Sequence, residues 1–68
     1  MRYPNLEAEL ARRGLNYKDV AEAVGKSTRT ITNKLNGTTS FTIAECLAIK
    51  DNLMPDINMD IGTLFESE

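Results

Sequence analysis

The 68-residue chain contains no histidine and a single cysteine, Cys46. One thiol cannot form an intrachain disulfide, and without histidine there is neither a Cys/His zinc site nor a Cys–His nucleophile pair. The glycines stand singly rather than in a phosphate-binding loop, and the acidic residues are scattered. In 68 residues there is also little room for a substrate cleft. The sequence therefore predicts no enzyme activity, no metal site, no cofactor and no small-molecule ligand.

Long apolar runs are also missing, because none approaches the 18 residues that a membrane span needs. The opening Met-Arg-Tyr-Pro lacks the apolar segment of a signal peptide. We therefore expect no membrane partner, and the lone thiol favours a cytoplasmic location. The 41% of hydrophobic residues are enough for a compact core, and the length allows one domain at most.

Basic residues are absent from residues 51–68, which carry five acids and a charge of −5. All eight lysines and arginines lie within residues 1–50 beside five acids, which leaves that part at +3. Fields between exposed charges act over about 8 Å at physiological salt. The N-terminal part can therefore approach a polyanion although the net charge is −2. The acidic end is expected to be solvated, or else to stay away from DNA or meet a basic partner.

Turn and capping residues divide the chain into four or five short helices, and no run of alternating β-branched residues predicts a strand. A first helix carries Leu6 and Leu10 on one face and ends at Gly14. A second begins after Asn16, an N-cap followed three positions on by an acid, and ends at Gly25. The sequence thus predicts an all-α fold.

Two further helices are expected in the C-terminal half. The fourth runs from residue 43 to about residue 53, before a proline, and its broad apolar stripe is expected to comprise Ile43, Ala44, Leu47 and Ala48. Cys46 is expected to be a small buried side chain on this helix. A short fifth helix is predicted over residues 60–65. Residues 55–68 are expected either to pack on the core or to form an interface.

The third predicted helix, within the stretch KSTRTITNKLNG at residues 26–37, has only two large apolar residues, Ile31 and Leu35. Ser27 is its expected N-cap. At 100° per residue the opposite face carries no apolar residue and no acid. That face comprises Arg29, Thr32, Asn33 and Asn36, with Thr28 at its edge. Arginine pairs with guanine, asparagine with adenine and the threonine methyl with thymine, so this face suits the major groove.

The pattern Tyr17-xxx-Ala21-xxx-Gly25-xxxxx-Ile31-xxx-Leu35, followed by Asn-Gly, resembles the helix-turn-helix of lambda-type Cro and repressor proteins, the XRE family. The resemblance covers most of the chain, and DIGTLFE at residues 60–66 is similar to the C-terminal segment of small regulators of phages and mobile elements. It implies a compact lambda-repressor-like domain over residues 1–68, with the helix-turn-helix at residues 17–36.

The resemblance implies a transcriptional regulator, a Cro-like or short repressor of a phage or mobile element, that binds double-stranded DNA in the bacterial nucleoid. A homodimer is expected on a pseudo-palindromic operator. The residues expected to read bases are Thr28, Arg29, Thr32 and Asn33. Those expected to contact phosphates are Asn16, Tyr17, Lys18, Lys26, Ser27, Lys34, Asn36 and Thr38. Tyr17 departs from the family, which usually has glutamine there.

A second function remains open at this point, a protein-interaction module of the antitoxin or antirepressor kind on the same scaffold. Such a module needs an exposed apolar patch. The candidates are Ile57, Met59, Ile61, Leu64 and Phe65, which can equally cover the core. Arg12 and Arg13 are expected to be charges at the C-terminal end of the first helix rather than DNA ligands.

Overall fold

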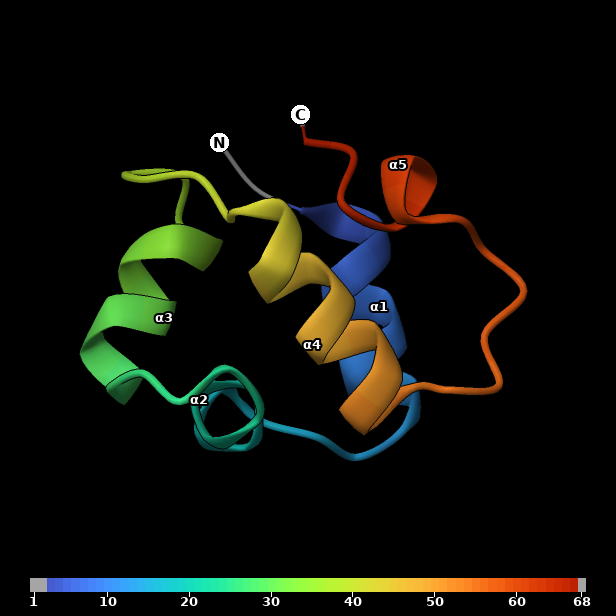
Figure 1. The fold of residues 1–68 in the computed structure, drawn as a ribbon, viewed down its shortest axis with the longest axis horizontal. Coiled ribbons are helices and arrows are strands. Elements are labelled where there is room, and N and C mark those ends of the chain that lie inside the picture. The colour runs from blue at the N-terminus through green and yellow to red at the C-terminus, as the bar shows by residue number, and fades with distance from the viewer. Residues whose placement is uncertain (1–2, 68) are drawn as a thin grey trace.

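The computed structural model describes residues 3–67, and within that range it contains five helices and no strand (Figure 1). The helices are α1 (Pro4–Arg12), α2 (Tyr17–Val24), α3 (Thr28–Leu35), α4 (Ile43–Leu53) and α5 (Ile61–Leu64). The all-α prediction is confirmed. No helix within residues 3–67 is long and apolar enough to cross a membrane.

The boundaries of the second and third helices follow from local capping. The Asn16 side chain accepts a hydrogen bond from the Asp19 backbone at 3.0 Å, and the Asp19 carboxylate accepts one from the Asn16 backbone at 2.9 Å. Gly25 ends α2 with φ of 73°, a left-handed conformation that suits glycine. Ser27 then caps α3 by accepting a hydrogen bond from the Thr30 backbone at 3.1 Å. These predicted caps are all confirmed.

The core lies where α2 packs against α3 and α4, with α1 and α5 closing the other side. Its fully buried side chains come from all five helices and from the residue that follows α4. They are Leu6, Val20, Ile31, Leu35, Ile49, Met54 and Leu64. Ile31 and Leu35 are the two residues by which α3 is seated, as their spacing predicts.

The C-terminal segment covers this core. Leu64 is fully buried, and Ile57, Met59 and Phe65 are partly buried against the same cluster. Tyr3, Phe41 and Phe65 form an edge-to-face cluster with ring centroids 5.3–6.3 Å apart. This cluster joins the start of α1, the loop before α4 and the end of α5. Four apolar side chains of residues 55–67, Ile57, Met59, Leu64 and Phe65, therefore pack on the core.

Helix α4 differs from the prediction in its rotation about its own axis. Ile43 is 71% exposed and Leu47 is 45% exposed, whereas Glu45, Cys46 and Ile49 are buried. The expectation that Ile43 and Leu47 face inward was therefore wrong. Apolar residues occupy most sides of α4, so hydrophobic periodicity alone does not determine which side is buried. The buried thiol of Cys46 was predicted correctly, and burial, followed by the nearby Glu45 carboxylate, raises its pKa.

A largely buried ion pair lies on the buried side of α4, together with Cys46 and Ile49. The Lys34 ammonium at the end of α3 lies 3.2 Å from the Glu45 carboxylate at the start of α4, and the two side chains are 12% and 10% exposed. Lys34 also donates a hydrogen bond to the Ser40 carbonyl at 2.9 Å and lies 5.9 Å from the centre of the Phe41 ring. Glu45 in turn accepts a hydrogen bond from the Thr42 backbone at 2.9 Å, as part of a capping box.

We predict that Lys34→Met lowers the free energy of unfolding by about 1–3 kcal/mol, because it leaves a mostly buried carboxylate without its counter-charge. The double variant Lys34→Met/Glu45→Gln should recover more than half of the loss, since glutamine keeps the capping-box acceptor without the charge. Urea unfolding measures both. Lys50→Met on α4 is the matched control, with an expected change below about 0.5 kcal/mol. Equal losses in the single and double variants would contradict the role of the pair.

We also predict a loss of stability in acid that depends on Glu45. Burial raises the pKa of its carboxyl, but the Thr42 backbone and the Lys34 ammonium outweigh burial, so the pKa lies below its ordinary value. The stabilisation is complete above the unfolded-state pKa of about 4.3 and is lost as pH falls through the lower folded-state value. Thermal melts between about pH 7 and pH 3 should show a shallower decline for Glu45→Gln than for the natural chain.

Candidate nucleic-acid interface

Helix α3 lies at one edge of the molecule and is attached to it along a single face. In Figure 1 α2 is seen nearly end-on while α3 runs across the view, so the two helices cross steeply. The connection between them is the short turn of Gly25, Lys26 and Ser27. Ile31 and Leu35 are the buried residues of α3, and the exposed residues Thr28, Arg29 and Asn33 on its other side are available to a ligand.

The predicted base-reading residues are brought together on this outward face. Thr28, Arg29 and Asn33 are exposed, and Thr32 is half-buried. The Thr32 hydroxyl donates to the Thr28 carbonyl at 2.9 Å, so its hydrogen is already used within the helix. Thr32 therefore offers a methyl group and an acceptor oxygen, whereas Arg29 offers donors only and Asn33 offers both donors and an acceptor.

The start of α3 presents backbone donors rather than the Ser27 hydroxyl. That hydroxyl accepts from the Thr30 backbone and donates to the Thr30 hydroxyl at 2.9 Å. The first N–H groups of an α-helix, here those of Thr28 and Arg29, have no carbonyl within the helix to bind. With the helix dipole they favour an anion. Ser27 thus holds the turn, and an anion at this point would be bound by the backbone.

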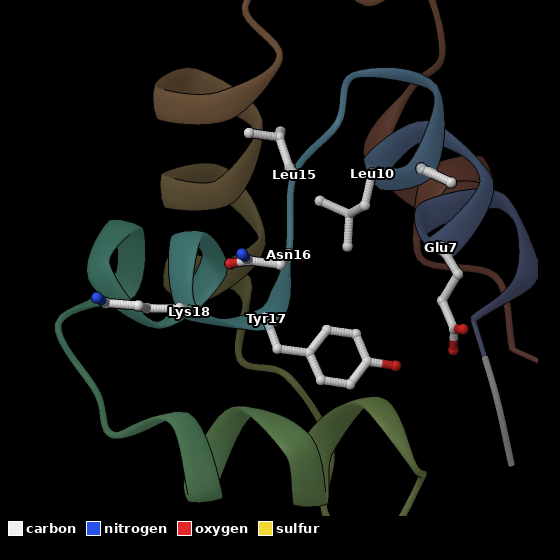
Figure 2. A pocket seen from close by; sticks show the side chains of 7 residues that line it. Glu7, Leu10, Leu15, Asn16, Tyr17 and Lys18 are labelled. Atoms are coloured by element: carbon white, nitrogen blue, oxygen red, sulfur yellow. The ribbon is translucent and has the colours of Figure 1, made fainter.

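The start of α2 carries three further predicted residues, which point in different directions. Figure 2 shows Tyr17 extending from α2 toward the side chains of α1, whereas Lys18 extends the opposite way. Tyr17 is partly buried against the core and lines an open hollow of about 490 Å³ together with Glu7, Leu10, Ala11, Leu15, Asn16 and Lys18. Asn16 uses its side-chain oxygen in the capping box, which leaves its amide NH₂ to act as a donor.

The basic side chains separate into two groups. Lys18, Lys26 and Arg29 are exposed and form no ion pair with another described residue. Lys34, predicted to contact a phosphate, instead faces inward and pairs with Glu45, and its 12% exposed side chain leaves little surface for a phosphate. On a helical wheel Lys34 lies only about 60° from Ile31, and this angle was the signal that it borders the buried face.

Arg12 and Arg13 are likewise engaged within the protein. The buried carboxylate of Glu9 lies 2.6 Å from Arg12 and 3.4 Å from Arg13. Arg13 also binds Asp56 at 2.7 Å, which lowers the pKa of that exposed carboxyl and links the end of α1 to the loop after α4. This agrees with their predicted role as charges of the first helix. Sequence reasoning did not identify Asp56 as the partner of Arg13, because the two residues are 43 positions apart in the chain.

The end of α3 supplies two more exposed residues from the predicted phosphate set. Asn36 occupies the C-cap, and the Thr38 backbone N–H donates to the Asn33 carbonyl at 3.0 Å. Both lie at the opposite end of α3 from Lys26. The predicted set, without Lys34, therefore brackets the base-reading face at both ends. Residues 3–67 contain no group of three or more histidine, cysteine or acidic side chains that could hold a metal ion.

Comparison with known proteins gives no match: the chain fits no protein-family model, and it matches no curated protein and no solved structure. Any functional assignment therefore depends on the geometry described above.

We predict that the Tyr17 hydroxyl is dispensable for folding although its ring is not. No hydrogen bond from this hydroxyl to another described residue is present, whereas the ring is packed on the core. Tyr17→Phe should change the free energy of unfolding by less than about 0.5 kcal/mol, and Tyr17→Ala should lower it by about 1–3 kcal/mol. Urea unfolding measures both changes. A large loss in Tyr17→Phe would show that the hydroxyl has a partner within the protein.

Proposed function

We propose that this protein is a sequence-specific DNA-binding transcriptional regulator with a lambda-repressor-like, XRE-type fold, in which α2 and α3 form the helix-turn-helix. The observation that carries the proposal is the outward face of α3. It presents Thr28, Arg29 and Asn33 without an acid or a large apolar side chain, while Ile31 and Leu35 fix the opposite face in the core. A Cro-like or short repressor of a phage or mobile element is the regulator type that the sequence pattern supports.

In the proposed complex α3 enters the major groove with its outward face toward the base edges. Arg29 reads guanine through O6 and N7, and Asn33 reads adenine through N6 and N7. Four residues of helix advance about 6 Å, close to the rise of two base steps. Arg29 and Asn33 should therefore read bases about two steps apart. Thr28 and the Thr32 methyl group supply the contacts beside them.

Contacts to the sugar–phosphate backbone would set the register of α3 in the groove. Lys26 and the first N–H groups of α3 flank one end of the reading face, and Asn36 and Thr38 flank the other. Asn16 and Lys18 would contact a neighbouring phosphate from the start of α2, and the Tyr17 hydroxyl, which extends the opposite way from Lys18, would contact a different one. Two such domains on a pseudo-palindromic operator would read half-sites about one helical turn apart.

The test compares Arg29→Ala with Lys26→Ala in binding to duplexes selected from a random pool. Arg29→Ala should lose discrimination at one base pair, at a cost of about 1–3 kcal/mol. Lys26→Ala should weaken all sequences alike and flatten the log–log salt dependence by about 0.9. Lys50→Ala on α4 should change neither. Circular dichroism establishes that all three variants remain folded.

Two outcomes would reject the proposal. If the natural chain enriches no duplex over bulk DNA, sequence-specific binding is wrong. If Arg29→Ala and Lys26→Ala change specificity and salt dependence equally, the separation into base-reading and phosphate-contacting residues is wrong even though DNA is bound.

A further inference from the structure

Asn33 is the residue of α3 that points most directly away from the core. Ile31 and Leu35 are fully buried and define the inner side of the helix. At about 100° per residue, Asn33 lies about 180° from the direction midway between them. Its side chain is exposed, so in the proposed complex it extends furthest toward the base edges.

The side-chain amide of Asn33 also keeps its full hydrogen-bonding capacity. No hydrogen bond joins it to another side chain or to the backbone within residues 3–67. By contrast, the Thr32 hydroxyl has already donated its hydrogen within the helix, and Arg29 offers donors only. Asn33 thus presents an acceptor oxygen and two N–H donors side by side.

The backbone that carries Asn33 is held on both sides. Its carbonyl accepts a hydrogen bond from the Thr38 N–H at 3.0 Å. The next residue, Lys34, is paired with Glu45 at 3.2 Å, and Leu35 lies in the core. The amide can turn about its own side-chain bonds, but the backbone cannot withdraw from the groove without breaking these contacts.

An amide with an acceptor beside a donor matches one base edge in the major groove. Adenine presents its N6–H donor beside the N7 acceptor, whereas guanine presents two acceptors, cytosine a donor, and thymine an acceptor beside a methyl group. Against any of the last three bases, one half of the amide would be left unpaired after losing its water, which is costly. Asn33 is therefore matched to adenine.

The two hydrogens on adenine N6 have different partners. One pairs with thymine inside the duplex, and the other faces the major groove. When the base pair is kept, a methyl group on N6 replaces the second hydrogen, so the Asn33 oxygen would face a methyl group instead of a donor. Its outward neighbours along the helix, Arg29 and Asn36, are polar, so no large apolar side chain there compensates by packing on the methyl group.

We propose that Asn33 makes this protein sensitive to adenine methylation. Binding is strong when the adenine read by Asn33 is unmodified, and it is weakened when that adenine carries a methyl group on N6. Because it requires α3 to lie in the major groove, this sensitivity rests on the proposed function. It adds a covalent mark on the DNA as a control of occupancy. An enzyme that methylates this adenine would release the protein without any change in the base sequence.

The test uses a duplex selected from a random pool. The base pair at which Asn33→Ala loses discrimination should be A·T, which identifies the adenine. A duplex with N6-methyladenine at that position should raise the dissociation constant of the natural chain by at least about tenfold. The same modification at an adenine outside the selected site is the matched DNA control and should leave the constant unchanged.

Protein variants separate Asn33 from its surroundings, and circular dichroism establishes that they are folded. Asn33→Ala should bind the methylated and unmethylated duplexes with constants that differ by less than about twofold, because the amide is gone and alanine leaves room for the methyl group. Arg29→Ala should bind more weakly overall and still distinguish the two duplexes by at least about tenfold. Replacing N7 of the same adenine by carbon should weaken the natural chain but not Asn33→Ala.

Three outcomes would overturn the proposal. The natural chain would bind methylated and unmethylated duplexes equally, Asn33→Ala would lose discrimination at no A·T pair, or methylation would weaken Asn33→Ala as much as the natural chain. In the last case the methyl group would act through the DNA or through another residue. A natural chain that enriches no duplex at all is a different result, because the proposed function itself then fails and the methylation sensitivity fails with it.

Discussion

The ion pair between Lys34 and Glu45 is the contact on which the placement of α3 against α4 depends. It joins the last turn of α3 to the first turn of α4, and both side chains are almost completely removed from water. Cys46 and Ile49 are buried on the same side of α4 as Glu45, and Ile43 and Leu47 are left outside. The ion pair and the burial of Ile49 together fix the rotation of α4, and the ion pair also limits the freedom of α3.

The limited burial of α3 is possible because its neighbours constrain it at three points. Ile31 and Leu35 attach its inner face, the Gly25 turn fixes its start, and Lys34 secures its end. A domain of 68 residues buries a smaller fraction of its surface than a larger one, so a helix with a polar outer face lowers its stability margin. Such a helix is expected where the outer face binds a ligand.

Local signals in the sequence were sufficient for the helix boundaries and for the inner face of α3. Caps such as Asn16 and Ser27 act over three residues, so they can be identified without knowledge of the fold. The rotation of α4 could not be predicted from periodicity, because its apolar residues occupy most sides. The inward direction of Lys34 was missed because lysine is usually exposed and its partner belongs to another helix.

The same ion pair joins the helix that would read bases to the helix that anchors it. α3 carries the side chains that would read bases, and α4 is held in the core by Cys46 and Ile49. Lys34 and Glu45 connect these helices directly, and the Lys34 contact with Ser40 holds the intervening loop. The orientation of α3 relative to the core is therefore fixed by packed elements rather than by a flexible linker. In the proposed complex, the way α3 enters the groove is then a property of the core, and the choice of bases is a property of the outward face of α3.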